Sequence, residues 1–354
     1  MDYVILEVLY CLQHRNDDNE YFVFVAPGAD RCLTSTERMH VLELRCPTYL
    51  LWEQWILPRA VRKAKVELLH CTSNTAPLHC TVPLILTLHD IIYLTEKKGN
   101  SRSFYQLLGW YYRRWNVPRI IDRCKQIITV SETARTNILN HFPQSGSRLT
   151  VVYNGCSNCY HPLSIEETRN ITRKYLPDNH YLLFFGNTDP RKNTIGVLRA
   201  YNDYLHQSAH PLKLVITGLK RDYVEDLLVE LNIEICASNL VYTGYIPSQD
   251  LPALYNGASV FLFPSLKEGF GIPVIEAMAC ATPVITSNCS SLPEVAGEEA
   301  LMVSPKNPKE IAESLIRLEN DEDFRKKQIA YGLKRAKLFS WENTADKYTK
   351  LYRL

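Results

Sequence analysis

The densest group of residues able to do chemistry lies in 268–288, a loop that runs into an expected helix. Two glycines flank a phenylalanine in a turn, and Pro273 favours the start of a helix. Glu268 and Glu276 then lie near the entrance of that helix, with Glu276 in its first turn. Backbone N–H groups at such an entrance point outward, so the segment can meet sugar hydroxyls or phosphate oxygens. The alternative is a tight turn with a capping glutamate and no ligand.

A second group follows a strand expected over 181–186. Arg191 and Lys192 stand just before a helix expected over 193–206. Two cations beside a helix N-terminus oppose the helix dipole, so a bound anion stabilises them there. The pattern predicts a diphosphate site, and the alternative is a solvated basic turn.

Three weaker patterns remain. His89 precedes Asp90 after an apolar run, and such a pair serves either a structural hydrogen bond or a catalytic site. Cys156 and Cys159 form a C-x-x-C without a second pair or spaced histidines, so we interpret them as structural.

The stretch 110–119 interleaves aromatic rings and cations on an expected helix. It is either a half-buried helix with solvated arginines or a patch that touches an anionic membrane.

Several classes are disfavoured by what the sequence lacks. No G-x-x-x-x-G-K-[ST] loop is present and no G-x-G-x-x-G follows an expected strand, which argues against P-loop hydrolysis and NAD-type binding. No Asp-x-Asp cluster suggests a metal held against a diphosphate. The net charge of +2 gives no broad field for nucleic acid. Apolar runs are too short to span a bilayer and no signal peptide is recognisable, so a cytoplasmic location is expected.

Short apolar runs alternate with helical patterns, which predicts an α/β protein built from βαβ units. The runs are nearly continuous, as expected for parallel strands buried on both faces. Strands are expected over 21–27, 66–71, 82–88, 126–131, 149–153, 181–186, 213–217, 259–263 and 282–286. Helices are expected over 3–12, 102–124, 131–141, 164–176, 193–206 and 221–231.

A cluster of Gly, Asn, Ser and Pro over 154–164 marks a domain boundary. We therefore expect two doubly wound domains, 1–157 and 158–338. A ligand would bind at the carboxyl ends of the strands, in the cleft between the domains.

Together these residues resemble a family 4 glycosyltransferase of GT-B fold, with two Rossmann-like domains that face each other across a cleft. The closest likeness is to bacterial mannosyltransferases of envelope polysaccharides. The motifs that carry the resemblance are E-G-F-G-I-P-V-I-E-A-M-A from residue 268, D-P-R-K-N from 189, 89-HD-90, 130-VSETAR-135, 152-VYNGC-156, 290-SSLPEVAG-297 and 339-FSWENTA-345. The resemblance also implies that residues 339–354 form a helix packing on the N-terminal domain.

The resemblance implies a role for each site residue. Glu268 contacts hydroxyls of the donor sugar, Glu276 binds the nucleotide ribose, and Arg191 with Lys192 clamps the diphosphate. His89, at the end of a strand in the N-terminal domain, faces the donor sugar and the acceptor. The other binding residues implied are Gly186, Asn187, Tyr245, Ile246, Gly269, Phe270, Gly271 and Ile272.

The expected function is metal-independent transfer of a hexose, with retention of anomeric configuration, from a nucleotide sugar to a saccharide or lipid-linked acceptor. No cofactor is expected. GDP-mannose is the first expectation for the donor, and a UDP-hexose is the alternative. Family members begin with a strand and a glycine-rich turn before the helix that 3–12 matches. A nucleotide-sugar-binding protein with impaired catalysis is therefore the rival function, and a dinucleotide oxidoreductase is disfavoured.

Overall fold

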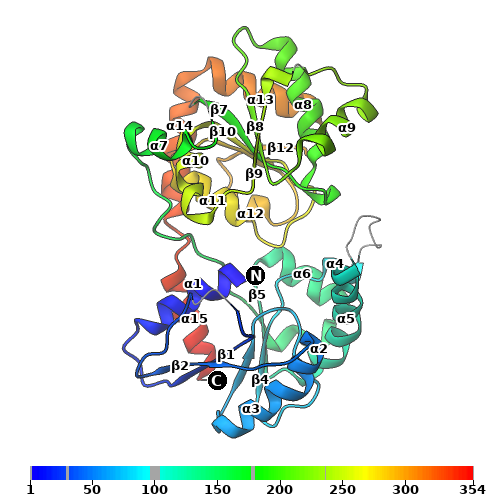
Figure 1. The fold of residues 1–354 in the computed structure, drawn as a ribbon, viewed down its shortest axis with the longest axis vertical. Coiled ribbons are helices and arrows are strands. Elements are labelled where there is room, and N and C mark those ends of the chain that lie inside the picture. The colour runs from blue at the N-terminus through cyan, green and yellow to red at the C-terminus, as the bar shows by residue number, and fades with distance from the viewer. Residues whose placement is uncertain (1, 29–31, 96–103, 177–179, 236, 354) are drawn as a thin grey trace. The chain divides into compact units, whose positions relative to one another are not determined.

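The computed structural model describes residues 2–28, 32–95, 104–176, 180–235 and 237–353. The chain divides into two compact units (Figure 1). Unit 1 comprises residues 1–155 and 340–354, and unit 2 comprises residues 156–339. These limits lie within two residues of the predicted ones. Among the described residues, no helix is long and apolar enough to cross a membrane.

Unit 2 is built on a six-stranded parallel sheet with the order β12-β11-β10-β7-β8-β9. Its strands are β7 (Tyr181–Phe185), β8 (Leu214–Thr217), β9 (Leu240–Gly244), β10 (Ala258–Phe263), β11 (Val284–Ser287) and β12 (Leu301–Val303). The chain adds β8 and β9 on one side of β7 and then returns to add β10 on the other. The strand order therefore reverses between β7 and β10, and in doubly wound sheets ligands bind beyond the carboxyl ends at this point.

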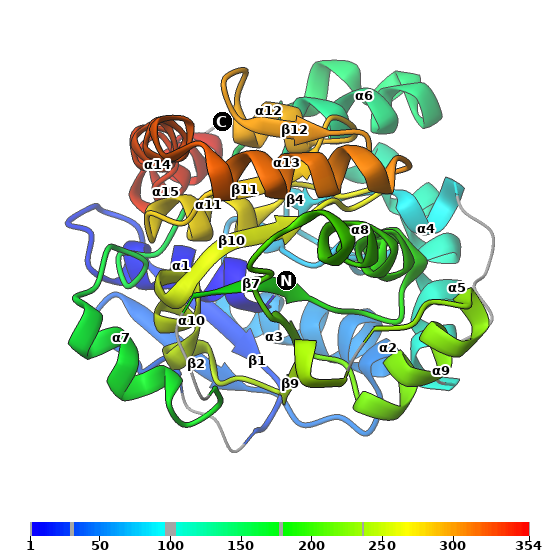
Figure 2. The same ribbon diagram turned by 90° about the horizontal axis from the view of Figure 1, so that it is seen from above.

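Helices cover both faces of this sheet, which explains why its central strands β7, β8 and β10 are mostly apolar. Alternate residues such as Phe184 and Leu262 pack against α8, α9 and α13, whereas Phe185 and Phe261 meet Tyr255 of α10. In Figure 2, α8 and α13 lie side by side over the sheet. The helices are α7 (Ile165–Thr172), α8 (Thr194–Gln207), α9 (Arg221–Leu231), α10 (Leu251–Gly257), α11 (Ile272–Ala279), α12 (Leu292–Ala296), α13 (Pro308–Asn320) and α14 (Glu322–Ala336).

Unit 1 has a four-stranded parallel sheet, β3-β4-β5-β6, and a separate parallel pair, β1-β2. The strands are β1 (Tyr21–Val25), β2 (Met39–Glu43), β3 (Leu69–Cys71), β4 (Leu84–Thr87), β5 (Gln126–Thr129) and β6 (Leu149–Val151). The helices are α1 (Asp2–Gln13), α2 (Tyr49–Leu51), α3 (Leu57–Ala64), α4 (Ile92–Thr95), α5 (Phe104–Ile120), α6 (Glu132–His141) and α15 (Trp341–Tyr352), with a π-helical turn at Trp52–Ile56. Side chains of α3, α5 and α6 join the sheet in one core.

Short 3₁₀ turns complete the two units. They lie at Ile121–Arg123 and Pro143–Arg148 in unit 1, and at Pro190–Lys192, Ala237–Asn239 and Ser248–Asp250 in unit 2.

Helix α15 completes unit 1 although it follows unit 2 in the chain. It packs on α1, where the rings of Tyr3 and Trp341 meet edge to face with centroids 6.0 Å apart. Trp341, Ala345 and Tyr348 are buried. Gly155 passes so close that a Cβ there would lie 2.3 Å from the backbone N of Trp341. The crossing at this point therefore requires glycine.

The expected elements are present with some differences. Strands β2, β9 and β12 were not among those expected from the sequence. The helix expected over 102–124 is α5, which ends at Ile120 in a 3₁₀ turn, and residues 102–103 lie outside the described residues. Pro118 has no N–H to donate to residue 114, which favours the end of the helix nearby.

Candidate active site

Three predicted residues of unit 2 lie where the strand order reverses. The loop after β7 carries Arg191 and Lys192, and the loop after β10 carries Glu268. The two loops are joined through their backbones, because Leu266 N donates to Arg191 O at 2.7 Å. Residues 76 positions apart thus become neighbours because β7 and β10 are adjacent parallel strands.

Lys192 and Glu268 form the central ion pair of this region. Lys192 Nζ lies 2.6 Å from Glu268 Oε1, and it also lies 5.4 Å from the centroid of the Phe263 ring. The side chain of Glu268 is 13% exposed and that of Lys192 is 28% exposed, so both can be reached by a ligand. An anion that binds Lys192 competes with Glu268, which frees this carboxylate to accept hydrogen bonds from hydroxyl groups.

Arg191 is held by Asp189 rather than extended into solvent. Its Nε and one terminal nitrogen donate to the Asp189 carboxylate at 2.7 to 3.1 Å, and Asp189 also accepts from Arg191 N. The two cations near the start of α8 are therefore each balanced by a carboxylate in this structure. This explains how they tolerate a helix N-terminus that disfavours cations, and it weakens the prediction that an anion is required there.

Asn193 is a structural residue that sequence reasoning did not single out. Its buried Nδ2 donates to Pro264 O at 2.9 Å and to Pro305 O at 2.7 Å, and its backbone is left-handed with φ 61°. It therefore ties the loop after β7 to the loops after β10 and β12. The signal was visible, since asparagine tolerates a left-handed backbone at a helix start, but its partners are far away in sequence.

The turn over Glu268–Gly271 is fixed by two serines. Ser290 Oγ donates to Glu268 O at 2.8 Å and accepts from Glu268 N, while Ser291 Oγ donates to Phe270 O at 2.7 Å. The Phe270 side chain is buried and meets the Phe339 ring edge to face. Only the backbone of Phe270 is therefore suited to contact a ligand.

Helix α11 begins at Ile272, so Glu276 is its fifth residue and not in its first turn as predicted. Gly271, with φ 123°, ends the loop one residue earlier than expected and moves Pro273 to the second helical position. Glu276 is 6% exposed, and its Oε2 accepts a hydrogen bond from Tyr255 OH at 3.0 Å.

Three glycines line the carboxyl ends of neighbouring strands. Gly186, Gly218 and Gly244 follow or end β7, β8 and β9, and Gly218 N donates to Gly244 O at 3.1 Å. A Cβ on Gly186 would lie 2.6 Å from Leu219, whereas one on Gly244 would meet nothing within 4 Å. Of the three, only Gly244 therefore leaves its backbone open to a ligand. Gly218 was not predicted.

The other predicted residues near this edge differ in exposure. Asn187 is exposed, and its Oδ1 accepts from Asp189 N at 2.8 Å. Tyr245 is 86% exposed, whereas Ile246 is buried. Ile272 begins α11 and is partly exposed. A ligand can thus contact the ring of Tyr245, whereas the side chain of Ile246 is almost inaccessible.

His89 belongs to unit 1 and follows the carboxyl end of β4. Its Nε2 lies 2.9 Å from Thr72 O, which can only accept, so Nε2 carries the proton. Its partner is not Asp90, whose carboxylate accepts from Ile92 N at 2.9 Å. Burial lowers the pKa of His89 from its usual range, so the ring is neutral near pH 7.

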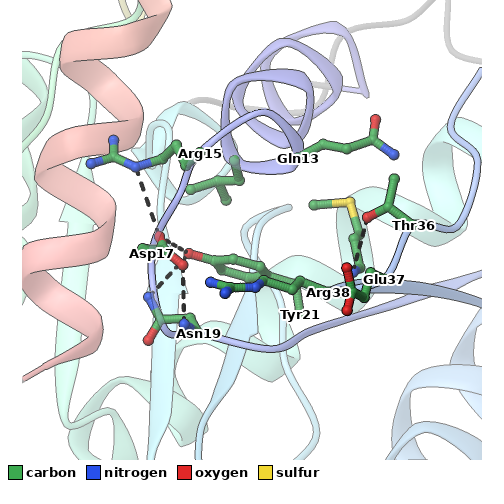
Figure 3. Close-up of a pocket in the computed structure, with 10 residues that line it drawn as sticks. Gln13, Arg15, Asp17, Asn19, Tyr21, Thr36, Glu37 and Arg38 are labelled. Atoms are coloured by element: carbon green, nitrogen blue, oxygen red, sulfur yellow. Dashed lines mark hydrogen bonds and ion pairs between the residues drawn. The ribbon is translucent and has the colours of Figure 1, made fainter.

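A polar cavity of about 200 Å³ also lies in unit 1 (Figure 3). It opens beside the end of α1 and the first residues of β1 and β2, where Asp17 accepts from Tyr21 OH at 2.8 Å. None of the predicted site residues lines it. In the described parts of the chain, no group of three or more His, Cys, Asp or Glu side chains could hold a metal ion.

Two family models match the chain in the order of its units. Residues 5–157 match the model "Glycosyltransferase Family 4" and residues 164–335 match "Glycosyl transferases group 1". The O-antigen chain mannosyltransferase B of Escherichia coli is 33% identical over 297 residues, which are 83% of this chain and 76% of that relative. The chain belongs to the family 4 glycosyltransferases. The predicted family is thereby confirmed.

Further relatives and structures agree with this family. The O-antigen chain mannosyltransferase RfbU of Salmonella typhimurium is 27% identical over 82% of this chain and 74% of its own. Two solved structures share the fold: Anabaena HepE in complex with UDP and glucose, and sucrose-phosphate synthase from Thermosynechococcus elongatus. HepE has a TM-score of 0.73 and 18% identity over 99% of this chain and 95% of its own; the synthase has 0.71 and 20% over 99% and 92%. The predicted GT-B fold with two Rossmann-like domains is confirmed.

Proposed function

We propose that this glycosyltransferase moves a mannosyl residue from GDP-mannose to a saccharide or lipid-linked saccharide in envelope polysaccharide synthesis, with retention and without a metal or other cofactor. The mannosyltransferases among the relatives support the sugar, and a UDP-hexose is the alternative donor. The observation that carries the proposal is the Lys192–Glu268 pair at the reversal point of the sheet.

The proposed chemistry assigns each group to a charge that changes during transfer. As the glycosidic bond breaks, negative charge grows on the leaving diphosphate and the sugar becomes oxocarbenium-like. Lys192 and Arg191 stabilise that phosphate, Glu268 accepts from the sugar hydroxyls once Lys192 turns to the phosphate, and Glu276 binds the ribose. Tyr245 and Ile246 lie by the base, and His89 faces the sugar. A leaving phosphate oxygen takes the acceptor proton on the same face.

The first prediction tests this assignment. Glu268→Gln and Lys192→Ala should each lower kcat with GDP-mannose about a hundredfold, because each removes a group placed at developing charge or at the sugar. Lys326→Ala, which breaks an exposed ion pair with Glu322 on α14, is the matched control and should leave kcat unchanged. Initial rates with a panel of nucleotide sugars measure this.

Four outcomes of this assay and of its companion measurements contradict the proposal. A loss below tenfold in both variants removes the assigned roles. Nucleotide binding without turnover on any acceptor identifies the rival, a binding protein with impaired catalysis. Loss of activity with a chelator contradicts metal independence, and an inverted anomeric signal in the product's NMR spectrum contradicts retention.

We further propose that unit 1 contacts the cytoplasmic face of an anionic membrane through an aromatic–basic surface. We define this surface as the exposed residues Tyr49, Leu50, Leu51, Trp55, Leu108, Tyr111 and Trp115 with the neighbouring cations Arg59, Arg62 and Arg119. Two segments form it side by side, because Gln54 Nε2 donates to Tyr112 OH at 2.6 Å and the rings of Tyr49 and Tyr112 meet.

Charge complementarity supports a lipid surface as the occupant. Within 49–65 the only acidic residue is Glu53, which is 2% exposed and accepts from Tyr49 OH and Thr75 Oγ1. The same range holds four cations. Exposed tryptophan and tyrosine beside arginine suit the headgroup region of an anionic bilayer.

Two arginines of the stretch 110–119, Arg113 and Arg114, are not part of this surface because they contact α4. Arg114 donates to Tyr93 O at 2.8 Å and to Leu94 O at 2.9 Å, and its guanidinium lies over the Trp110 ring. The Arg113 guanidinium lies over the Tyr93 ring. Both arginines therefore hold α4 against α5, and their replacement would disturb the fold as well as the surface.

The second prediction is tested by co-sedimentation with vesicles. The protein should bind vesicles that contain phosphatidylglycerol more tightly than vesicles of phosphatidylcholine alone. Trp55→Ala with Tyr111→Ala, and separately Arg59→Glu with Arg62→Glu, should each weaken that binding at least about tenfold. Transfer to a soluble acceptor should be unchanged. Val229→Ser on α9, which replaces an exposed apolar residue of unit 2, is the control. Wild-type binding by both double variants would remove the membrane role.

A further inference from the structure

Glu276 is held by a tyrosine that no ligand can reach. Tyr255 of α10 is fully buried, and its hydroxyl donates to Glu276 Oε2 at 3.0 Å. Its ring packs against Phe185, Phe261 and Tyr160 with centroids 5.1 to 5.9 Å away. The hydroxyl is therefore aimed at the carboxylate by a rigid aromatic cluster.

The backbone of Tyr255 is fixed as well. Thr282 Oγ1, just before β11, donates to Tyr255 O at 2.6 Å. Burial and the negative charge of Glu276 raise the pKa of Tyr255 well above its usual range, so the hydroxyl stays protonated and acts as the donor. A carboxylate as buried as Glu276 needs such donors to remain charged.

We propose that Tyr255 is a positioning residue for the donor nucleotide, which fixes the rotamer of Glu276 so that this carboxylate accepts from the ribose hydroxyls. The proposal rests on the ribose role given to Glu276 above. A carboxylate that recognises two hydroxyl groups of a ribose must hold both of its oxygens at set positions. Rotation about the Cγ–Cδ bond of the glutamate breaks its hydrogen bonds to these hydroxyls. The hydrogen bond from Tyr255 opposes that rotation.

The phenylalanine variant isolates the hydroxyl. Tyr255→Phe keeps the ring and its packing and removes only the donor. The matched control is Tyr181→Phe, because Tyr181 is also buried in unit 2 and its hydroxyl donates at 2.7 Å to Leu254 O, a backbone carbonyl. Each variant loses one buried hydrogen bond, but only Tyr255→Phe loses one that reaches Glu276.

The test is calorimetric binding of a ribonucleotide and its 2′-deoxy and 3′-deoxy analogues. The nucleotide is GDP or UDP, whichever the wild-type protein binds more tightly. Tyr255→Phe should weaken binding of the ribonucleotide about fivefold to tenfold and change binding of the analogue that lacks the recognised hydroxyl less than twofold. Its donor KM should rise by the same factor while kcat stays within twofold. Tyr181→Phe should leave every affinity unchanged.

The outcomes separate this inference from the proposal on which it rests. Equal wild-type affinity for the ribonucleotide and both analogues overturns the ribose role of Glu276 and the inference with it. Wild-type discrimination that Tyr255→Phe fully retains overturns the inference alone. So does an equal loss for the ribonucleotide and the analogues, because a general structural defect weakens all of them.

Discussion

Asn193 shows how one amide can organise three loops. It bridges the backbone after β10 and the backbone after β12 from a left-handed position at the start of α8. The loop that carries Arg191 and Lys192 is thereby fixed to the loop that carries Glu268. If the proposed donor site is correct, donor affinity should depend on Asn193, a buried residue.

The third prediction follows from these bonds. Asn193→Gly keeps the left-handed backbone and removes the amide, so two buried carbonyls lose a donor. The free energy of unfolding of unit 2 should fall by about 2 kcal/mol, and donor affinity should fall severalfold. The control is Asn232→Gly, at another left-handed position with φ 53° at the end of α9. It should change neither quantity measurably in urea unfolding and calorimetry, and an equal loss in both variants would contradict the bridging role.

At the residue scale, the sequence identified candidate side chains but not how they pair. The cations were predicted because they precede a helix N-terminus, and the carboxylates because they lie at the entrance of another helix. That Lys192 pairs with Glu268 and Arg191 with Asp189 depends on side-chain distances that no local pattern contains. The ligand roles of these residues stay predictions.

Helix α11 illustrates control at the scale of an element. The loop before it ends at Gly271, whose φ of 123° is rarely adopted by other residues, and a Cβ there would lie 2.7 Å from Leu292 Cδ2. The start of α11, and with it the placement of Glu276, depends on this glycine.

The fourth prediction compares two glycine replacements. Gly271→Ala should lower the free energy of unfolding of unit 2 by about 1 to 3 kcal/mol and weaken nucleotide binding, because strain and overpacking add. Gly109→Ala should raise that of unit 1 by up to about 1 kcal/mol, since Gly109 lies inside α5 and a Cβ would come no closer than 3.9 Å to Arg113. Thermal unfolding with amide exchange resolves the two units. A neutral Gly271→Ala would contradict the strain argument.

At the element scale, most strands were predicted, including the half-exposed β1 and the three-residue β3 and β6, whereas β2, β9 and β12 were missed. β7, β8 and β10 are continuous apolar runs because helices cover both faces of the sheet. β2 mixes polar residues and is exposed at one end, and β12 has three residues. Such strands are specified by their neighbours, and their own sequences carry little signal.

At the scale of the whole molecule, a buried histidine makes the stability of unit 1 depend on pH. His70 of β3 is neutral in unit 1, with its ring nitrogens 2.8 Å from Tyr352 OH and Thr87 Oγ1. Burial, with a smaller effect of His89, lowers the pKa of His70 to about 3. Because the unfolded chain binds this proton near pH 6.5 and the folded chain does not, stability is lost as the pH falls from about 6.5 towards 3.

The fifth prediction tests this dependence on pH. The free energy of unfolding of unit 1 should fall by as much as about 1.4 kcal/mol per pH unit through His70 over that range. His70→Gln should reduce this slope, and His206→Gln, which replaces an exposed histidine of α8, should not. Urea unfolding monitored by amide exchange at about pH 7 and about pH 5 measures the slopes. An unchanged slope in His70→Gln would contradict the burial of a neutral imidazole.

The return of α15 to unit 1 has a consequence for synthesis. A ribosome that has translated residues up to 339 has made all of unit 2, but unit 1 still lacks Trp341, Ala345 and Tyr348 from its core. The half that is translated first is therefore the half that matures last. A chain that ends at residue 339 and has left the ribosome should expose unit 1 to chaperones and proteases while unit 2 already resists them.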